Sequence, residues 1–354
     1  MPLSDDLNAV TDNRLKTYNG TTYYYYDNFG NLIHREMADG EVQNYFYDLH
    51  DQLVKAEIFK KDGTKETWAY SYDALGRRIG KGRLKNKEVS ETSFPHDLGG
   101  NGLEEETRFV WDGSHLLQEQ NSDGSYTYIY TDPESYEPLA QVHNWTNEEG
   151  ESRQQTHYFH CDQIGIPREM TDKDGNLLWF GNYTGWGRLK EETKVADTAY
   201  QPFRLQNQYA DRETGLHYNF FRYYDPQLGR FVSQDPIGLA GDLNAYRFAP
   251  NSQEWVDPLG LEVDAVFNKR TGLLTIVDRE TKQVITGKFH SGNGTGRLTR
   301  NNLVRLSQVV NIIFWNMGRI RTFLDWSPLI KIMVMILMKP QEEIYFDYIS
   351  QVGL

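Results

Sequence analysis

Two aspartates share an Asp-Pro-x-Gly-Leu context in which paired carboxylates could do acid–base chemistry. Asp235 lies in DPIGL and Asp257 in DPLGL, 22 residues apart. A hairpin or an Ω-shaped excursion of that length can bring the two side chains together. Peptide hydrolysis by carboxylates needs such a pair, because one activates water while the other protonates or polarises the carbonyl. The same pattern is also an ordinary turn signal, and taken alone it favours two turns.

The elements that must position these aspartates are predicted to be β-strands. The chain has 354 residues, of which 38% are hydrophobic and 14% aromatic, with 23 Tyr, 17 Phe and 8 Trp. Disordered chains are poor in aromatic residues, so disorder is disfavoured. The 30 Gly and 12 Pro indicate many tight turns. A repetitive β-protein fits this composition better than a helical bundle.

Composition also excludes several classes of function. The single cysteine, Cys161, rules out an intramolecular disulfide framework and a cysteine-cluster zinc site. The net charge of −13 argues against a general nucleic-acid binder, and no apolar run is long enough for a stable membrane span. The N-terminus lacks the form of a signal peptide. We therefore expect a cytoplasmic protein with no cofactor, no metal and no nucleic-acid partner.

The first part of the chain is built of similar units. Three of them read YYYYDNFGNLIHRE, YFYDLHDQLVKAE and YSYDALGRRIGKG, and their aspartates, Asp27, Asp48 and Asp73, are 21 and 25 residues apart. Alternating Tyr-x-Tyr predicts a strand with one buried face, and the following Asp and Gly predict a tight turn. A hairpin cannot bury its aromatic face alone, so successive units must stack into one long antiparallel sheet. The tyrosines are then mainly core, although exposed rings would suit a carbohydrate-binding surface.

This pattern resembles the tyrosine–aspartate (YD) repeats of the Rhs and teneurin-like families. A stronger resemblance to the conserved core of bacterial Rhs proteins lies in residues 158–190 and in residues 209–261, which contain YADRETGLHYNFFRYYDPQLGRFVSQDPIGLAGDLNAY and a final DPLGL. It implies a mainly β fold, in which YD/RHS repeats form a spiralling antiparallel β-sheet shell around a C-terminal toxin segment.

The resemblance also implies chemistry. In Rhs proteins the core is an intramolecular aspartic protease that cuts after DPxGL, which places the cut here between Leu261 and Glu262. It selects Asp235 and Asp257 as the catalytic pair and adds Arg222, which can orient a carboxylate through paired hydrogen bonds. The reaction is then in cis and single-turnover. Asp225, in YYDPQLGR, is expected to share the turn without the catalytic role.

Four segments follow. We expect a YD-repeat shell in 1–157, a conserved RHS segment in 158–199, the Rhs-associated core in 200–261 and a variable toxin tip in 262–354. The charge changes at the last boundary: residues 262–354 hold 12 Lys and Arg against 8 Asp and Glu, a balance of +4, whereas the rest carries −17. The resemblance implies that the tip is the shell's own partner. For full-length relatives it implies an immunity protein, secretion-spike proteins and export by a type VI or similar machine for interbacterial competition.

The tip begins with two hairpin-like units, Ala265–Val277 and Val284–His290. Their sequence resembles the opening of peptidoglycan-targeting toxins related to L,D-transpeptidases. The catalytic cysteine of that family has no counterpart after Cys161, so we expect a small β or α+β tip, partly irregular, that is not an active enzyme.

From about residue 300 the tip changes character. Trp and Met each have a single codon, so the DNA at these positions can be inferred from the protein. When that DNA is read one frame over, from the third base of each codon, it must encode polar or small residues, for example Glu across Trp315–Asn316 and Asp across Met335–Ile336. We interpret this stretch as frameshifted. The alternatives are a membrane-active tip, suggested by the apolar run Ile330–Met338, and for the whole chain a cell-surface carbohydrate-binding aromatic β-repeat module with no catalysis.

Overall fold

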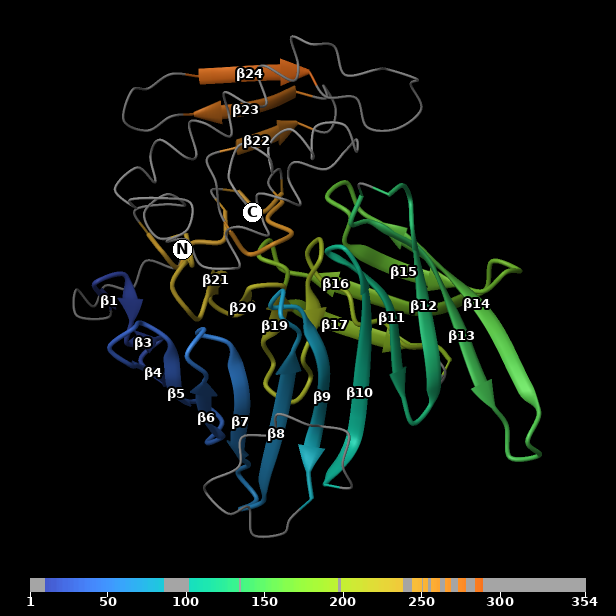
Figure 1. Cartoon of the computed structure of the whole chain (residues 1–354), viewed down its shortest axis with the longest axis horizontal. Helices are drawn as coiled ribbons and strands as arrows, with labels where there is room; N and C mark the ends of the chain where they lie inside the picture. Colours follow the sequence, from blue (N-terminus) through green and yellow to red (C-terminus); the bar gives the residue numbers. More distant parts are fainter. Residues whose placement is uncertain are drawn as a thin grey trace, which may run out of the picture. The chain divides into compact units, whose positions relative to one another are not determined.

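A computed structural model describes residues 10–85, 102–133, 135–196, 199–237, 244–249, 251–253 and 256–261, and the backbone of three strands between 265 and 288. The chain divides into two compact units, 1–303 and 304–354, and the second lies outside the described residues. The described residues form strands, turns and loops, with no helix that could cross a membrane (Figure 1). The prediction of a mainly β fold is confirmed.

The largest sheet has 15 strands in chain order, and each pairs antiparallel with the next (Figure 1). A sheet built this way contains only hairpins between neighbours, as the repeat pattern predicts. Its strands are β3 (Thr17–Tyr18), β4 (Thr22–Tyr26), β5 (Leu32–Glu36), β6 (Val42–Tyr47), β7 (Leu53–Phe59), β8 (Lys65–Tyr72), β9 (Arg78–Leu84), β10 (Leu103–Asp112), β11 (His115–Asn121), β12 (Gly124–Tyr130), β13 (Pro138–Thr146), β14 (Ser152–Cys161), β15 (Pro167–Thr171), β16 (Leu177–Tyr183) and β17 (Leu189–Lys194).

Three small antiparallel sheets complete the described strands. Strands β1 (Val10–Thr11) and β2 (Arg14–Leu15) pair near the start. The segment that carries the candidate aspartates forms a four-stranded sheet of β18 (Tyr209–Ala210), β19 (His217–Asn219), β20 (Arg222–Asp225) and β21 (Arg230–Phe231). In the tip, β22 (Ala265–Asn268), β23 (Leu273–Val277) and β24 (Val284–Lys288) form a three-stranded meander. The predicted unit Ala265–Val277 is a hairpin of β22 and β23, whereas the unit Val284–His290 contributes one described strand, β24, which pairs with β23. The proposed frameshifted stretch lies outside the described residues.

One turn design recurs along the large sheet. In the first repeat, Oδ1 of Asp27 accepts the amide hydrogens of Phe29 and Asn31, each at 2.9 Å, and the Gly30 amide donates to the Asp27 carbonyl. Gly30 has a φ of +89°, a conformation that suits glycine. The same pair of aspartate contacts, to the amides two and four residues later, is made by Asp48, Asp73, Asp162 and Asp172.

Replacing one of these aspartates is expected to weaken its hairpin. Asp48→Ala removes the acceptor of the His50 and Gln52 amides, which lie 2.8 and 3.0 Å from Oδ1. Two lost hydrogen bonds correspond to about 1–2 kcal/mol in the free energy of unfolding. Urea denaturation measures the loss. Asp48→Asn is the matched control because its amide oxygen still accepts both hydrogens, and an equal loss in both variants would contradict this explanation.

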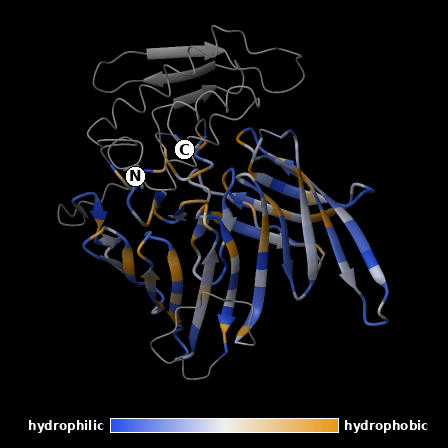
Figure 2. Ribbon diagram, viewed as in Figure 1, coloured by the Kyte–Doolittle hydropathy of each residue, from blue (hydrophilic) through white to orange (hydrophobic). Residues whose placement is uncertain are grey.

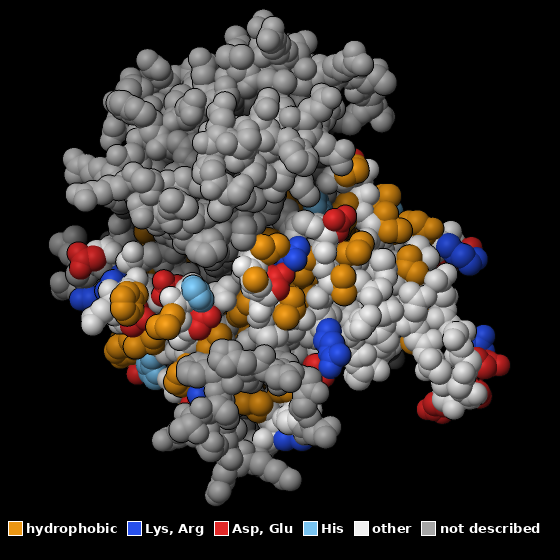
Figure 3. All heavy atoms as spheres, viewed as in Figure 1, with side chains coloured by type: hydrophobic (Ala, Val, Ile, Leu, Met, Phe, Trp, Pro, Cys, Tyr) orange, Lys and Arg blue, Asp and Glu red, His pale blue; other side chains and the backbone are white. Residues whose placement is uncertain are grey.

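The strands alternate between a buried and an exposed face, visible as alternating hydropathy along them (Figure 2). In β4, Tyr24 is buried whereas Tyr23 and Tyr25 are 42 and 48% exposed. The buried faces pack on residues 199–232, and the core cluster combines rings of the sheet with rings of this segment, as in the contact of Tyr128 with Phe203. Exposed hydrophobic side chains lie scattered among polar and charged ones (Figure 3).

The structure thus places most repeat tyrosines that it describes in the core, as predicted. Those near the ends of strands also link neighbouring hairpins. The hydroxyl of Tyr72 donates to the Leu53 carbonyl at 2.7 Å, and that of Tyr130 donates to the Leu116 carbonyl at 2.9 Å. Each of these hydrogen bonds joins the last strand residue of one repeat to a strand of the preceding repeat.

Candidate functional site

The three predicted site residues come from different elements of the small sheet region. Arg222 is the first residue of β20, directly after the Phe220–Phe221 turn that joins it to β19. Asp235 follows β21, and Asp257 opens the last described turn before the tip. Arg222 is 1% exposed and each aspartate is 6% exposed. The structure brings all three together in the protein interior.

Arg222 lies between the two carboxylates. Its Nη2 is 3.0 Å from Oδ2 of Asp235 and 3.6 Å from Oδ2 of Asp257. The guanidinium also donates from Nη1 to the Ala245 carbonyl at 3.1 Å, and its carbon lies 3.6 Å from the centre of the Phe231 ring. A buried guanidinium held on several sides keeps a fixed position, so it can hold two carboxylates near each other despite their repulsion.

Asp257 occupies a turn like those of the repeats. Its Oδ1 accepts the amide hydrogen of Leu261 at 2.9 Å, the four-residue contact of the hairpin aspartates. Its Oδ2 accepts no hydrogen bond from the described residues. Burial raises the pKa of Asp257 to about 6, and the nearby Asp235 adds to the rise, whereas Arg222 and the Leu261 amide oppose it. Below that pH the side chain is a neutral acid with a proton to give.

Asp235 is held in place by its side chain and by its backbone amide. Its Oδ1 accepts the Ile237 amide at 3.0 Å, and its own amide donates to the Ala245 carbonyl at 2.9 Å. That carbonyl also accepts from Arg222, so backbone and side chain fix Asp235 against the arginine. Both aspartates are therefore turn residues and members of one buried pair. The two readings of the sequence do not exclude each other.

Asp225 forms a similar turn, but it pairs with a different arginine from Asp235 and Asp257. Its Oδ1 accepts the amides of Gln227 and Leu228, and its Oδ2 lies 3.0 Å from Nη1 of Arg35 in β5. It therefore anchors the small sheet to the large one, in agreement with the expectation of a turn. Leu261 is buried beside Asp257, whereas Glu262, on the far side of the predicted cut, lies outside the described residues.

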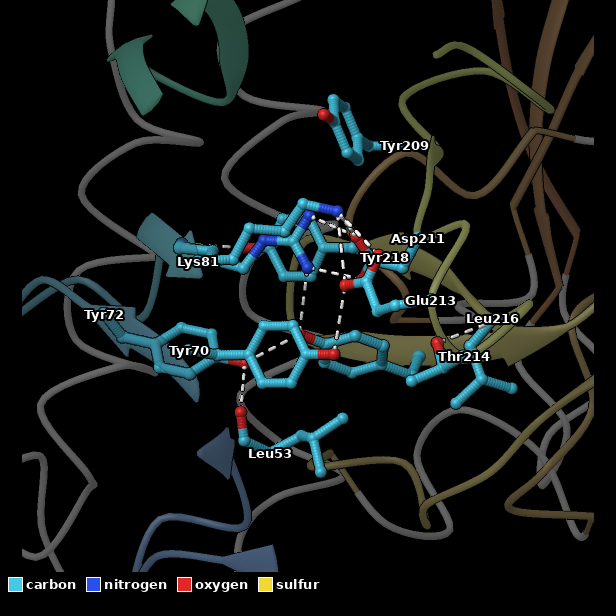
Figure 4. A network of polar contacts seen from close by, with 12 residues as sticks. Leu53, Tyr70, Tyr72, Lys81, Tyr209, Asp211, Glu213, Thr214, Leu216 and Tyr218 are labelled. Atoms are coloured by element: carbon cyan, nitrogen blue, oxygen red, sulfur yellow. Dashed lines mark hydrogen bonds and ion pairs between the residues drawn. The ribbon is translucent and has the colours of Figure 1, made fainter. Parts of the chain in front are cut away.

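A buried ion network holds the segment that carries the site against strand β9 (Figure 4). Asp211 accepts both terminal nitrogens of Arg78, at 2.5 and 3.0 Å, and Nζ of Lys81 at 3.0 Å. Lys81 also lies 2.9 Å from Glu213, whose Oε1 accepts the Tyr70 hydroxyl. Figure 4 shows Asp211 and Glu213 meeting Lys81 above the ring of Tyr70.

Two residues that the sequence analysis did not single out touch the turn of Asp257. Nδ2 of Asn219 donates to the Asp257 carbonyl at 3.0 Å, and Nδ2 of Asn207 donates to the Pro258 carbonyl at 2.5 Å. Asn219 belongs to the YNFFRYYDP stretch of the motif, which is the one signal that could have marked it. Within the described part of the chain, no group of three or more His, Cys, Asp or Glu residues could hold a metal ion.

Comparison with known proteins decides the family. The family model of the RHS protein matches residues 156–193. Double-stranded DNA deaminase toxin A of Burkholderia cenocepacia strain H111 is 39% identical over 263 residues, which cover 71% of this chain and 18% of the relative. The chain belongs to the RHS family.

Other RHS-related proteins match a similar share of the chain. Toxin protein Tse5 of Pseudomonas aeruginosa is 33% identical over 72% of this chain and 20% of its own. The probable deoxyribonuclease RhsB of Dickeya dadantii strain 3937 is 31% identical over 68% of this chain and 15% of its own. The RHS chain described here thus spans about a fifth or less of these relatives. Among solved structures, TcdB2-TccC3 without its hypervariable C-terminal region is 21% identical, with a TM-score of 0.46 over 68% of this chain and 13% of that one.

Proposed function

We propose that this chain is the C-terminal part of an RHS polymorphic toxin that hydrolyses its own backbone between Leu261 and Glu262. The observation that carries the proposal is the position of Arg222 between two buried carboxylates, one of which also holds the Leu261 amide. Leu261, the residue on the acyl side of the proposed cut, is thus hydrogen-bonded to Asp257 of the acid–base pair before any reaction.

The roles follow from the contacts. Asp235, paired with Arg222, is the carboxylate that takes a proton from water, and the water oxygen attacks the Leu261 carbonyl carbon. Asp257, neutral below about pH 6, supplies a proton to the carbonyl oxygen. The C–N bond then breaks: the amine of Glu262 leaves with the proton that Asp235 had taken, and one hydroxyl of the tetrahedral intermediate returns its proton to Asp257 as the carboxyl group forms. The products are a carboxyl terminus at Leu261 and an amino terminus at Glu262.

The relatives support a division between carrier and cargo. Their printed names refer to a DNA deaminase toxin, a toxin protein and a probable deoxyribonuclease, yet each matches about 70% of this chain. A region shared by proteins with such different names is better suited to carry an activity than to define it. We therefore assign residues 1–261 to the carrier and residues 262–354 to the cargo.

The cargo is proposed to be a peptidoglycan-targeting tip made inactive by a frameshift after about residue 300. In this role the β-shell would enclose its own tip, and full-length relatives would need an immunity protein and an export machine of the type VI kind for interbacterial competition. Production would be in the cytoplasm. Sequencing the gene tests the frameshift, because a single inserted or deleted base must restore the polar reading.

The mass of the purified full chain tests self-cleavage directly. Hydrolysis at the proposed bond gives fragments 1–261 and 262–354, and a chain of unchanged mass would contradict the proposal.

The rate of self-cleavage is expected to fall as the pH rises above about 6. The pKa of Asp257 is raised, so its neutral form, the proton donor, prevails below that value and is lost above it. The loss is about tenfold for each pH unit beyond the pKa. Chain unfolded in urea is diluted into buffers between pH 5 and 8, and the released 262–354 fragment is followed over time. A rate that rises steadily from pH 6 to pH 8 would rule out Asp257 as the donor.

A further inference from the structure

Each backbone carbonyl from Asp257 to Gly260 accepts a hydrogen bond from the core. The donors are Nδ2 of Asn219 for Asp257, Nδ2 of Asn207 for Pro258, the Phe221 amide for Leu259 at 3.2 Å, and Nε of Arg222 for Gly260. We call these four contacts the carbonyl clamp. They determine the register of the chain up to Leu261, the residue at which the proposed cut occurs.

Three of the four donors come from one tight hairpin. Asn219 ends β19, Arg222 begins β20, and Phe220 between them has a φ of +56°. On the other side of the clamp, Gly260 has a φ of +68°, and a Cβ there would lie 2.7 Å from the Asn219 carbonyl oxygen. The two turns can approach this closely only because residue 260 is glycine.

Folding alone gives little reason for an amide at position 219. The side chain is fully buried, and its Oδ1 has no hydrogen-bond partner among the described residues. A buried acceptor without a donor is unfavourable, and a leucine of similar size would remove that acceptor together with the donor to the Asp257 carbonyl, so its two effects on stability oppose each other. The group that the site uses is the Nδ2 donor, which holds the carbonyl of Asp257, a member of the acid–base pair.

We infer that Asn219 and Asn207 are positioning residues for self-cleavage, an inference that rests on the proposed function. By holding the Asp257 and Pro258 carbonyls, they align the Leu261–Glu262 bond, rather than a neighbouring bond, with the two carboxyls. The same contacts remain after hydrolysis, because they all lie on the acyl side of the cut. The new C-terminus therefore stays in the site and each chain cuts once.

The test is the rate of self-cleavage during refolding of the full chain from urea, beside its thermal stability. Stability is measured with Asp257→Asn added, so that every chain stays uncut. Asn219→Leu is expected to slow cleavage about 10- to 100-fold, the range for small misplacements of reacting groups, while its midpoint of unfolding changes little, because removal of the unpaired Oδ1 opposes the loss of the Nδ2 donor. Asn207→Ala, at a less buried position, is expected to slow cleavage by up to about tenfold and covers the case in which Asn219→Leu fails to fold.

The matched control is Gln208→Ala. Gln208 is a buried amide next to Asn207 whose Oε1 faces Nδ1 of His217 at 2.9 Å. Among the described residues, its side chain makes no hydrogen bond to residues 257–261. It should lower the midpoint of unfolding but leave the cleavage rate unchanged. If Asn219→Leu and Asn207→Ala cut at the wild-type rate after Leu261, the clamp is overturned while self-cleavage stands. An uncut wild-type chain, or cleavage that survives Asp257→Asn, overturns the proposed function itself.

Discussion

Asp235→Asn and Asp257→Asn are each expected to leave the chain in one piece, while the wild-type chain splits after Leu261. The amide has nearly the same shape as the carboxyl, so the turn contacts to the Ile237 and Leu261 amides can remain. It can neither take a proton from water nor supply one as an acid, and general acid–base catalysis contributes about 10²–10⁴-fold to rates. Intact mass of the three purified proteins is the measurement.

Asp162→Asn is the matched control for this experiment. Asp162 makes the same turn contacts, to the Ile164 and Ile166 amides at 3.1 Å, and its side chain takes no part in the Arg222 pair. It should cut as the wild type does. If the Asp235 or Asp257 variant still splits after Leu261, that aspartate is a turn residue only.

Breaking the buried ion network at Asp211 is expected to lower the free energy of unfolding by about 3–5 kcal/mol. Asp211→Asn leaves Arg78 and Lys81 buried with Glu213 as the remaining carboxylate of the network. Such uncompensated buried charge is far more costly than a lost surface pair. Urea denaturation, in a chain kept uncut by Asp257→Asn, measures the difference.

The pH dependence gives the same prediction a second readout. Burial raises the pKa of Asp211, but Arg78 and Lys81 lower it by more than burial raises it. The pKa of Asp211 therefore lies below its usual range. A depressed pKa means that the stabilisation is present above the unfolded value, near 4, and is lost as the pH falls through the folded value. Asp211→Asn should remove that part of the acid sensitivity.

A surface pair is the control for Asp211. Glu151 pairs with Arg153, and both side chains are more than half exposed. Glu151→Gln should therefore change the unfolding midpoint little. A loss of less than about 1 kcal/mol in Asp211→Asn would contradict the anchoring role of the network.

The site was only partly predictable from the sequence. Asp235 and Asp257 stand out because each repeats an Asp-Pro-x-Gly-Leu context, and the resemblance to Rhs cores added Arg222. Asn207 carries no such mark and Asn219 has only its place in the YNFFRYYDP stretch, because what distinguishes the two is the carbonyl that each amide meets 51 and 38 residues further along the chain. Contacts of that span are not visible in a local pattern.

The sequence by itself determined the repeating unit of this protein. Alternating rings give a strand one buried face, and Asp with Gly closes the turn through contacts only two and four residues apart, as at Asp27. Such short-range interactions act on the chain locally, so the pattern predicts the hairpins of the repeats that it marks and their stacking into one antiparallel sheet.

Only the tertiary structure decided what each turn aspartate does. Asp225 and Asp235 both precede proline in similar turns, yet Asp225 meets Arg35, which is 190 residues away, and Asp235 meets Arg222 beside Asp257. For Asp225 the partner depends on which face of the large sheet packs on the small one, and for Asp235 it depends on how the loops around the small sheet fold back on β20. Folding brings charges that are distant in the sequence together in an interior without water. There a charged group needs an opposite charge beside it, because otherwise its neutral form is favoured.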